Sequence, residues 1–395
     1  MTILPNSDSL VFRETTDPEV IKYTHFQNGN NWKGELSLEE YVQREAVLGK
    51  SEIGQKGKST ETIKRFPEGH EWVGLKYFIL ENLEVNSEKV TDRIVSSCEI
   101  LGRLGSCVYP GSKVEPCLVA TIGGVYTSPE NRGKGYARQM IEALNDHLDG
   151  VRDAPNSPDL IKNMVVILYS EVGEYYSNMG FKSEHVPLHI VTQLDEIEKR
   201  YCHQGTIEGR ELGFGGYEEL VALQDKAFSR NLEKVRKLNP YKFIFTVSAD
   251  IDLYKWFAHR DLFIMKKTNR MQKDLKFGFA LSDNSHIIWH HNWSGDSLII
   301  VKVFMEEGKP DAQLTLCKLI TMAVKETKKT GLKSLVFWDQ EIEIKQFPEL
   351  QKELLEMEHE SNVYAKNSSL SAFRPPKGFG VDNVIWDNNT KFCWF

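Results

Sequence analysis

A glycine-rich turn with two basic residues offers the clearest chemistry in the sequence. Residues 132–135, RGKG, follow a strand-like segment at 117–127 and run directly into a segment with helical apolar spacing at 136–148. A helix N-terminus presents unpaired backbone N–H groups and the positive end of the helix dipole. Glycines just before it let the main chain close around an anion. We therefore predict that this turn binds a pyrophosphate, with Lys134 and Arg138 adding positive charge.

Other phosphate-binding loops have different spacings. The turn is one glycine step shorter than the GxGxxG of dinucleotide-binding folds, and no acidic residue ends a following strand at the expected distance. The P-loop pattern GxxxxGK(S/T) is absent from the sequence. For the tetrapeptide alone, a solvated basic loop remains the alternative.

The segments around the turn indicate a mixed α/β fold. Gly123 and Gly124, paired inside a strand, indicate a bulge or a close backbone approach. Ser37 and Glu40 form a capping-box signature at the start of a helix. Residues 107–109 either continue the third strand or form a further short one. The predicted order is strand 10–15, helices 18–26 and 37–48, strands 72–80, 92–101 and 117–127, helix 136–148, strand 164–169, helix 172–179 and strand 181–191.

Two motifs in this region carry a family resemblance. Residues 132–137, RGKGYA, fit the (Q/R)xxG-x-(G/A) signature of the GNAT acyl-CoA N-acyltransferases. Residues 175–181, YYSNMGF, are similar to that family's second signature, a tyrosine followed by a Gly-Phe pair. The resemblance covers roughly residues 10–195. More narrowly, VYTSPENRGKGYA and LYSEVGEYYSNMGF resemble the fungal lysine N6-acetyltransferases, in which a GNAT domain carries a C-terminal extension.

The resemblance implies how acetyl-CoA, the expected cosubstrate, would bind. Its pantetheine arm would lie along the strand at Val125 and Thr127, and an amide near Gly124 would polarise the thioester carbonyl. The pyrophosphate would rest on the turn and the first helical residues, Arg132, Gly133, Lys134, Gly135, Tyr136 and Ala137. The acceptor amine would attack directly in a ternary complex.

Tyr176 matches the family tyrosine that donates a proton to the departing thiolate, and it is the predicted catalytic residue. A packed aromatic in a short helix is the alternative, and Tyr175 is a neighbour with the same side chain. The amine must also lose a proton, since a lysine side chain has an ordinary pKa near 10.4. The base stays open among ordered water, the C-terminal carboxylate and four side chains, which are Glu99, Glu171, Glu174 and His189.

The second half of the chain predicts another α/β arrangement in a similar order. The predicted elements are helix 216–228, strands 262–267, 276–281, 286–293 and 297–304, helix 311–328 and strand 332–339. This order predicts a C-terminal α+β domain that is a degenerate second GNAT-like domain, because MEEGKPDAQ stands where a phosphate turn should be. A generic α+β domain with coincidental order is the alternative. We therefore divide the chain into a catalytic domain at 1–200 and a domain at 201–395 that completes the acceptor pocket.

The whole-chain composition restricts the partners and the location. The chain has 395 residues and a formal net charge of −7, so no nucleic-acid or membrane partner is expected. Six scattered cysteines without a CxxC pair argue against a disulfide scaffold and a zinc site, and they suit the cytoplasm or the nucleus. His286 and His290 lie about 13 Å apart in an extended strand, so no metal is expected there. The aromatic C-terminal segment WDNNTKFCWF is expected to be docked.

Together these features predict an acetyl-CoA-dependent N-acetyltransferase. By resemblance, its acceptor is the ε-amine of free L-lysine. One alternative is an acetyltransferase for protein N-termini, protein lysines or another small amine. The other is a non-catalytic acyl-CoA-binding protein. The sequence does not indicate an oligomeric state.

Overall fold

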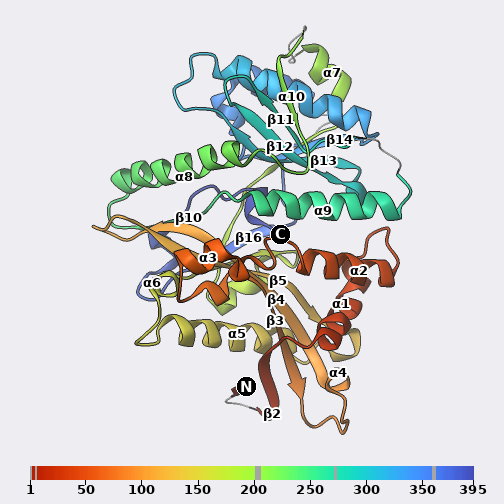
Figure 1. Cartoon of the computed structure of the whole chain (residues 1–395), viewed down its shortest axis with the longest axis vertical. Coiled ribbons are helices and arrows are strands. Elements are labelled where there is room, and N and C mark those ends of the chain that lie inside the picture. Colours follow the sequence, from red (N-terminus) through yellow and green to blue (C-terminus); the bar gives the residue numbers. More distant parts are fainter. Residues whose placement is uncertain (1, 5–6, 201–205, 271–273, 358–361) are drawn as a thin grey trace. The chain divides into compact units, whose positions relative to one another are not determined.

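The chain folds into two compact units in the computed structural model, which describes residues 2–4, 7–200, 206–270, 274–357 and 362–395 (Figure 1). Neither unit is one continuous stretch of sequence. The first contains residues 1–183, 231–248 and 371–387, and the second contains residues 184–230, 249–370 and 388–395. The division therefore differs from the predicted boundary at residue 200, because strands from the second half of the chain pair into the first sheet.

The first unit is built on a ten-stranded sheet. The order along its main path is β1-β2-β3-β4-β5-β6-β16-β7, and β10 joins the edge of β4 and pairs with β17. The strands predicted at 92–101 and 107–109 are parts of a single long strand, β4, which begins at Ile94 and ends at Val108, whereas residues 92 and 93 end α4. The strands are β1 (Thr2–Leu4), β2 (Ser7–Thr15), β3 (Gly74–Asn82), β4 (Ile94–Val108), β5 (Val114–Thr127), β6 (Val165–Ser170), β7 (Lys182–Glu184), β10 (Phe243–Val247), β16 (Leu370–Arg374) and β17 (Val384–Trp386).

Local sequence signals set the helix boundaries in this unit. The Ser37 hydroxyl and the Glu40 carboxylate form the predicted capping box at the start of α2. Asp17 caps α1 by accepting a hydrogen bond from the Glu19 N–H. The helices and 3-10 turns are α1 (Pro18–Trp32), α2 (Leu38–Gly49), η1 (Lys56–Lys58), α3 (Thr60–Arg65), η2 (His70–Trp72), α4 (Val90–Arg93), η3 (Pro129–Asn131), α5 (Tyr136–Arg152), α6 (Asp159–Lys162), η4 (Gly173–Met179) and η7 (Val381–Asn383).

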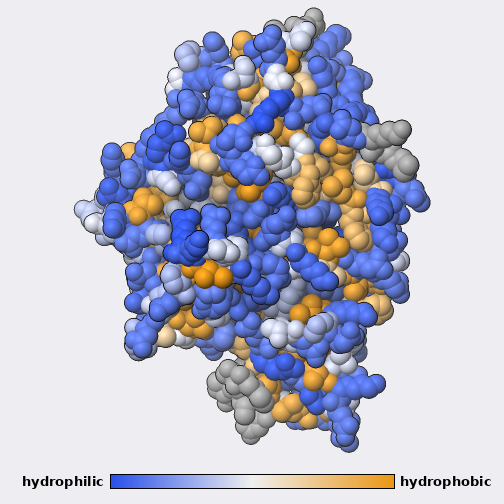
Figure 2. Space-filling model, viewed as in Figure 1, coloured by the Kyte–Doolittle hydropathy of each residue, from blue (hydrophilic) through white to orange (hydrophobic). Residues whose placement is uncertain are grey.

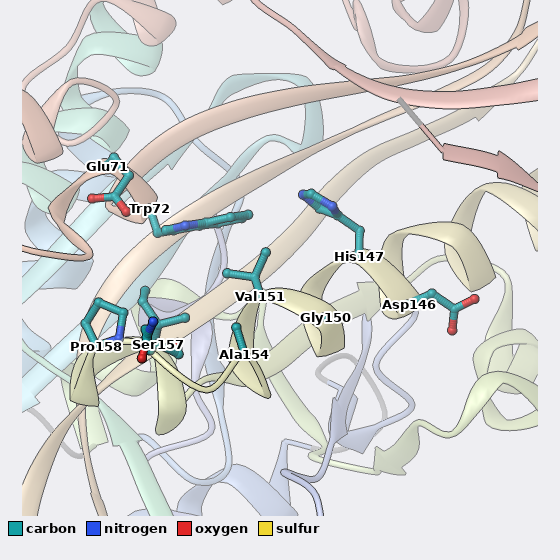
Figure 3. A pocket seen from close by; sticks show the side chains of 11 residues that line it. Glu71, Trp72, Asp146, His147, Gly150, Val151, Ala154, Ser157 and Pro158 are labelled. Carbon is teal, nitrogen blue, oxygen red and sulfur yellow. The ribbon is translucent and has the colours of Figure 1, made fainter.

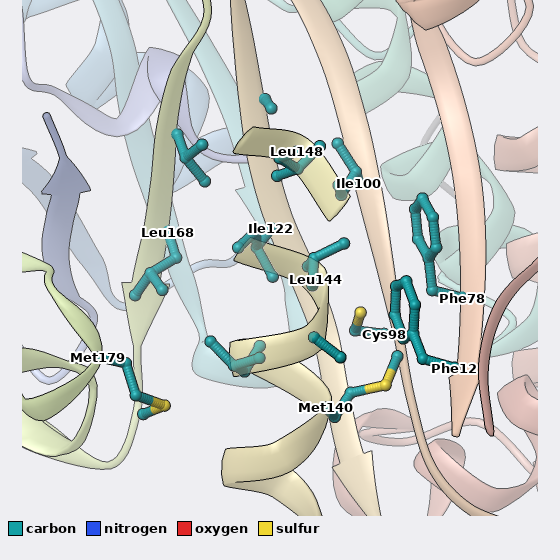
Figure 4. Close-up of a cluster of buried hydrophobic side chains, with 14 of the residues drawn as sticks. Phe12, Phe78, Cys98, Ile100, Ile122, Met140, Leu144, Leu148, Leu168 and Met179 are labelled. Carbon is teal, nitrogen blue, oxygen red and sulfur yellow. The ribbon is translucent and has the colours of Figure 1, made fainter. Parts of the chain in front are cut away.

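The main core of the first unit lies between α5 and the sheet. Figure 4 shows Met140, Leu144 and Leu148 of α5 directed toward strand residues such as Ile100 and Ile122. These side chains repeat at the spacing of one helix face, so one stripe of α5 is buried. Burying a side chain of this size contributes about 1.5–3 kcal/mol. This packing fixes α5, and with it the turn that precedes the helix.

An ionic fork ties the returning C-terminal segment to α5. The two terminal nitrogens of Arg374 on β16 contact the two carboxylate oxygens of Asp149. Lys377 also contacts Asp153, with 3.2 Å between Nζ and Oδ2. Residues 371–387 are therefore part of the first unit by packing and by charge.

The second unit has a seven-stranded sheet with the order β15-β8-β14-β13-β12-β11-β9. Its strands are β8 (Leu188–Val191), β9 (Gly209–Leu212), β11 (Gly278–Leu281), β12 (His286–Asn292), β13 (Ser297–Phe304), β14 (Ser334–Trp338) and β15 (Asn362–Ala365). Its helical elements are α7 (Leu194–Arg200), the first part of α8 (Glu218–Leu238), α9 (Ile251–Lys267), η5 (Trp293–Gly295), α10 (Ala312–Lys329), η6 (Ile344–Gln346), α11 (Pro348–Glu356) and η8 (Lys391–Cys393).

Two predicted strands are wrong. Residues 262–267 form the last part of α9, because the apolar run LFIMKK continues a helix that Asp250 caps. Residues 181–191 were predicted as one strand, but they form β7 in the first sheet and β8 in the second. A short apolar run does not distinguish a strand from a buried helix by its period alone.

The two sheets share one topology. In each, antiparallel strands lead to a parallel pair that is connected through a helix, as β5–α5–β6 in the first and β13–α10–β14 in the second. This repetition agrees with the predicted second GNAT-like domain. The C-terminal segment is docked, as predicted, since Phe392 and Cys393 are fully buried.

The visible surface is mostly polar. On the face drawn in Figure 2, hydrophilic residues predominate and hydrophobic ones form small, separate patches. Among the residues that the structure describes, no helix has the length and hydrophobicity needed to span a bilayer.

Candidate active site

The first sheet opens at its centre. The parallel strands β5 and β6 pair from Val119 and Val165 as far as Ile122 and Leu168. Beyond that point β5 continues to Thr127 and pairs only with β4 on its other side. The backbone groups on the β6 side of residues 123–127 therefore face a gap between the strands, where an extended ligand can pair with them as an added strand.

A bulge lies where the gap begins. The register between β4 and β5 shifts between Ser97 and Glu99, so that β5 has one more residue than β4 between Gly123 and Tyr126. Gly124 has a φ of +58°, which favours glycine. The predicted bulge at the paired glycines is confirmed. The bulge changes the direction in which the backbone N–H groups of β5 point. This change occurs near Gly124, where the family resemblance implies that the thioester carbonyl would lie.

The glycine turn lies between the end of β5 and the start of α5. Gly133 has a φ of +77° and Gly135 a φ of +83°, and both are left-handed conformations. Gly135 is the N-cap residue and supplies no side chain to the first amides of α5. A methyl group on Gly133 would meet no atom within 4 Å, and one on Gly135 would approach only the Gln139 side chain, at 3.9 Å. The turn is thus an open cradle of backbone amides.

The basic side chains of the turn are held at the surface. Arg132 donates from Nε to the Thr127 carbonyl oxygen over 3.2 Å, so a ligand that bonds to this oxygen must share it or displace Arg132. Lys134 donates to Asn131 over 3.1 Å. Arg138 pairs with Glu142 along α5. Because all three contacts are exposed, they are weak and the cations can turn toward an anion.

Tyr176 lies in the middle of η4, and its ring packs in the core beneath α5. The ring is in edge contact with Tyr175 and Phe181. Burial raises the pKa of the Tyr176 hydroxyl well above its usual range, so it carries its proton at neutral pH. Its neighbour Tyr175 is exposed. The structure therefore distinguishes the two tyrosines, and the role of Tyr176 as proton donor stays a prediction.

The four candidate bases lie in different surroundings. Glu171 accepts a hydrogen bond from the Trp32 indole over 3.0 Å, and Glu174 accepts one from Ser183 over 2.6 Å. His189 is buried in the second unit, where its Nε2 lies 2.8 Å from Asp339. Only Glu99 lies at the bulge, since a methyl group on Gly124 would be 3.3 Å from its Oε1. The sequence could not rank these four, because their surroundings depend on contacts distant along the chain.

Glu99 belongs to a buried polar group that the sequence did not reveal. We call this group the His25 cluster. It lies on the opposite face of the sheet from α5, because Cys98 and Ile100 point into the α5 core and Glu99 points away from it. Its members are His25 from α1, Tyr41, Arg44 and Glu45 from α2, Tyr77 from β3 and Glu99 from β4.

A separate hollow of about 590 Å³ lies at the other end of α5. Trp72 and His147, whose ring centroids are 5.7 Å apart, line it together with Val151 and Ala154 (Figure 3). It is remote from the glycine turn along the helix, and we assign it no part in the site. Among the described residues, no group of three or more His, Cys, Asp or Glu side chains is placed to hold a metal ion.

A splayed parallel strand pair, a bulged strand and a glycine turn that opens a helix define the GNAT fold class. The family described as "LYC1 GNAT-like C-terminal domain" matches residues 208–395. The Saccharomyces cerevisiae protein YGR111W, which carries the description uncharacterized, is 50% identical over the full length of both chains. A lysine acetyltransferase from Yarrowia lipolytica is 24% identical, over 84% of this chain and 85% of that protein.

Solved structures give a weaker likeness. A putative acetyltransferase from Pyrococcus horikoshii aligns over 95% of this chain and 92% of its own, with a TM-score of 0.48 and 11% identity. That likeness is too low to bear on function. The matched GNAT-like domain over residues 208–395 and the lysine acetyltransferase relative support a GNAT N-acetyltransferase.

Proposed function

We propose that this protein transfers the acetyl group of acetyl-CoA to a primary amine. The observation that carries the proposal is the open cradle at Gly133 and Gly135, which follows the end of β5, where among the described residues no strand pairs with it on the β6 side beyond Ile122. Backbone amides at a helix N-terminus suit a pyrophosphate, and a free strand edge suits an amide-containing arm. Bound acetyl-CoA would supply an activated acyl carbon.

The residues of this chain would act mainly by positioning. The amides of residues 133–137 would hold the pyrophosphate, and the backbone at Val125 and Thr127 would hold the arm. An N–H at the Gly124 bulge would stabilise the negative oxygen that forms on the acetyl group. Tyr176, protonated at neutral pH, would donate a proton to the departing sulfur. The amine would attack without a covalent enzyme intermediate.

The ε-amine of free L-lysine is the proposed acceptor. The support is the Yarrowia lipolytica relative, whose description is lysine acetyltransferase, and the sequence motifs that resemble that family. We also propose a cytoplasmic or nuclear location. The described cysteines, which are Cys98, Cys107, Cys117, Cys317 and Cys393, are all buried free thiols and are compatible with a reducing compartment.

An amine-panel assay tests the proposal. The purified full-length protein is mixed with acetyl-CoA and with free lysine, other amino acids, polyamines, a lysine-containing peptide or a peptide with a free N-terminus, and released thiol is measured. We expect turnover with free lysine to exceed turnover with the peptides. Turnover with peptides alone would indicate a protein acceptor. Binding of acetyl-CoA without turnover of any amine would contradict the enzymatic proposal.

A further inference from the structure

The His25 cluster places a carboxylate beside the proposed reaction centre. The Glu99 side chain lies against the bulge at Gly124, on the face of the sheet that α1 and α2 cover. It is 18% exposed, so it remains accessible to a small ligand. The strand β5 that passes over the bulge carries no acidic side chain between Cys117 and Thr127. A side-chain base for the amine would therefore come from another element.

A second member of the His25 cluster, the His25 imidazole itself, lies beside the Glu99 carboxylate. His25 is 5% exposed, and its Nε2 lies 3.7 Å from the Glu99 carboxylate. That distance is too long for a hydrogen bond, and Nε2 has no hydrogen-bond partner among the described residues. Burial is the largest single influence and would lower the pKa of His25, but the carboxylates of Glu99 and Glu45 together raise it above its ordinary value. The imidazole thus lies against the Glu99 carboxylate and can help to hold that side chain in place.

The charges around Glu99 favour a cation. Arg44 is paired with Glu45, with 2.8 Å between Nε and Oε1, and its guanidinium lies over the Tyr41 ring. Burial raises the pKa values of the Tyr41 and Tyr77 hydroxyls, so both stay neutral at physiological pH. With a neutral His25 the cluster has one positive and two negative groups, and with a protonated His25 its charges balance. While His25 is neutral, the site therefore attracts an alkylammonium ion, which is the form that a lysine side chain has near neutral pH.

We propose that Glu99 accepts the proton that the acceptor ammonium loses before attack, and that His25 positions and stabilises the Glu99 carboxylate. This inference rests on the proposed acetyl transfer. It makes Glu99 a catalytic residue and His25 a positioning residue.

The proton balance of the reaction is complete with these groups. An alkylammonium acceptor carries three protons on nitrogen. One passes to the Glu99 carboxylate and then to solvent, which frees the lone pair that forms the new N–C bond. A second reaches the coenzyme A sulfur by way of Tyr176 as the C–S bond breaks. The third stays on nitrogen in the amide product.

The test compares Glu99→Gln with Glu14→Gln, a matched loss of a strand carboxylate outside the cluster, where Glu14 pairs with Lys76. With the acceptor that the amine panel identifies, we expect Glu99→Gln to lower kcat/KM at pH 7 by about 100-fold or more, which is the usual contribution of a general base. Glu14→Gln should stay close to wild type. Stabilisation by acetyl-CoA in a thermal melt should be the same in all three proteins, because neither change touches the glycine turn.

The pH dependence separates a base from a structural residue. Without Glu99, only free amine can react, so kcat/KM of Glu99→Gln should rise about tenfold per pH unit between pH 7 and 9. The wild-type profile should be flatter, and His25→Gln should have an intermediate slope. Glu99→Asp, which retains a carboxylate, provides a second variant and should keep the wild-type slope with reduced rate.

Two outcomes would overturn this inference without overturning the proposed function. One is wild-type activity of Glu99→Gln at pH 7, and the other is a loss of activity with an unchanged pH slope. Either would leave the proposed acetyl transfer intact, because the wild-type protein would still turn over an amine. Failure of the wild-type protein with every amine would instead overturn the proposed function, and this inference with it.

Discussion

At the scale of single residues, the structure separates two adjacent tyrosines that the sequence presents as equals. Tyr176 packs among core side chains beneath α5, whereas Tyr175 is 40% exposed. The peptide carbonyl of Met179 accepts a hydrogen bond from Asn145 on α5 over 3.3 Å, which anchors the end of η4. Gly180, with a φ of +85°, ends this short helix as predicted. The Tyr176 ring is therefore held by fixed packing, which the predicted role as proton donor would require.

Changing Tyr176 to Phe should lower kcat by about 10- to 100-fold and leave the KM for acetyl-CoA nearly unchanged. The change removes a proton donor that acts only when the thiolate leaves, which is a transition-state contribution. Tyr175→Phe is the matched control and should retain wild-type kcat. Steady-state thiol release measures both variants. Equal activity of the two would remove Tyr176 from the mechanism.

At the scale of elements, the link between β5 and α5 carries the proposed binding site. The strand supplies a free edge, the turn supplies amides, and the buried stripe of α5 fixes both against the sheet. Gly135 is required by its backbone conformation, because no atom of the protein crowds the place of a side chain there. An added methyl group would project into the space where we propose that the pyrophosphate binds.

Gly135→Ala should weaken acetyl-CoA binding by at least about tenfold, which corresponds to about 1.4 kcal/mol. It should also cost about 1 kcal/mol or more of stability, because alanine is strained at a positive φ. Gly331→Ala is the control, since Gly331 has a φ of +74° after α10 and equally open surroundings. We expect a similar fall in melting temperature for both and weaker binding for Gly135→Ala alone. Weakened binding in both variants would point to general destabilisation.

Features that are set by a few adjacent residues could be predicted from the sequence. Features that depend on contacts between residues distant along the chain could not. The turn, the bulge at Gly123 and Gly124 and the capping box are written in a few adjacent residues, so they could be predicted. The His25 cluster joins α1, α2, β3 and β4, and no local pattern marks His25 as a partner of Glu99. The same limit explains why the pairing of β10 and β16 with the first sheet was missed.

At the scale of the whole molecule, two sheets of the same topology have different interiors. In the second unit, β13 also has an extra residue near Val301, opposite the step from Ile288 to Trp289. There, however, the buried carboxylate of Glu341 accepts a hydrogen bond from the Val303 N–H over 2.6 Å and pairs with Lys302 over 3.0 Å. The strand amide is therefore satisfied by the protein itself. In addition, the N-cap of α10 is Asp311, and the left-handed glycine of the preceding turn, Gly308, lies three residues before it.

This difference predicts one acetyl-CoA site per chain. Isothermal titration should give a stoichiometry of one, because α10 starts at an aspartate and not at a left-handed glycine, and the strand amide of Val303 is already bonded to a buried ion pair. Breaking such a pair costs about 3–5 kcal/mol, which a cosubstrate would have to offset before it could bind there. Asp311→Ala, at the start of α10, should leave the titration unchanged, whereas Gly135→Ala should weaken its single transition. A stoichiometry of two, or a tight site that persists in Gly135→Ala and is lost in Asp311→Ala, would place acetyl-CoA in the second unit and contradict the assignment of the glycine turn.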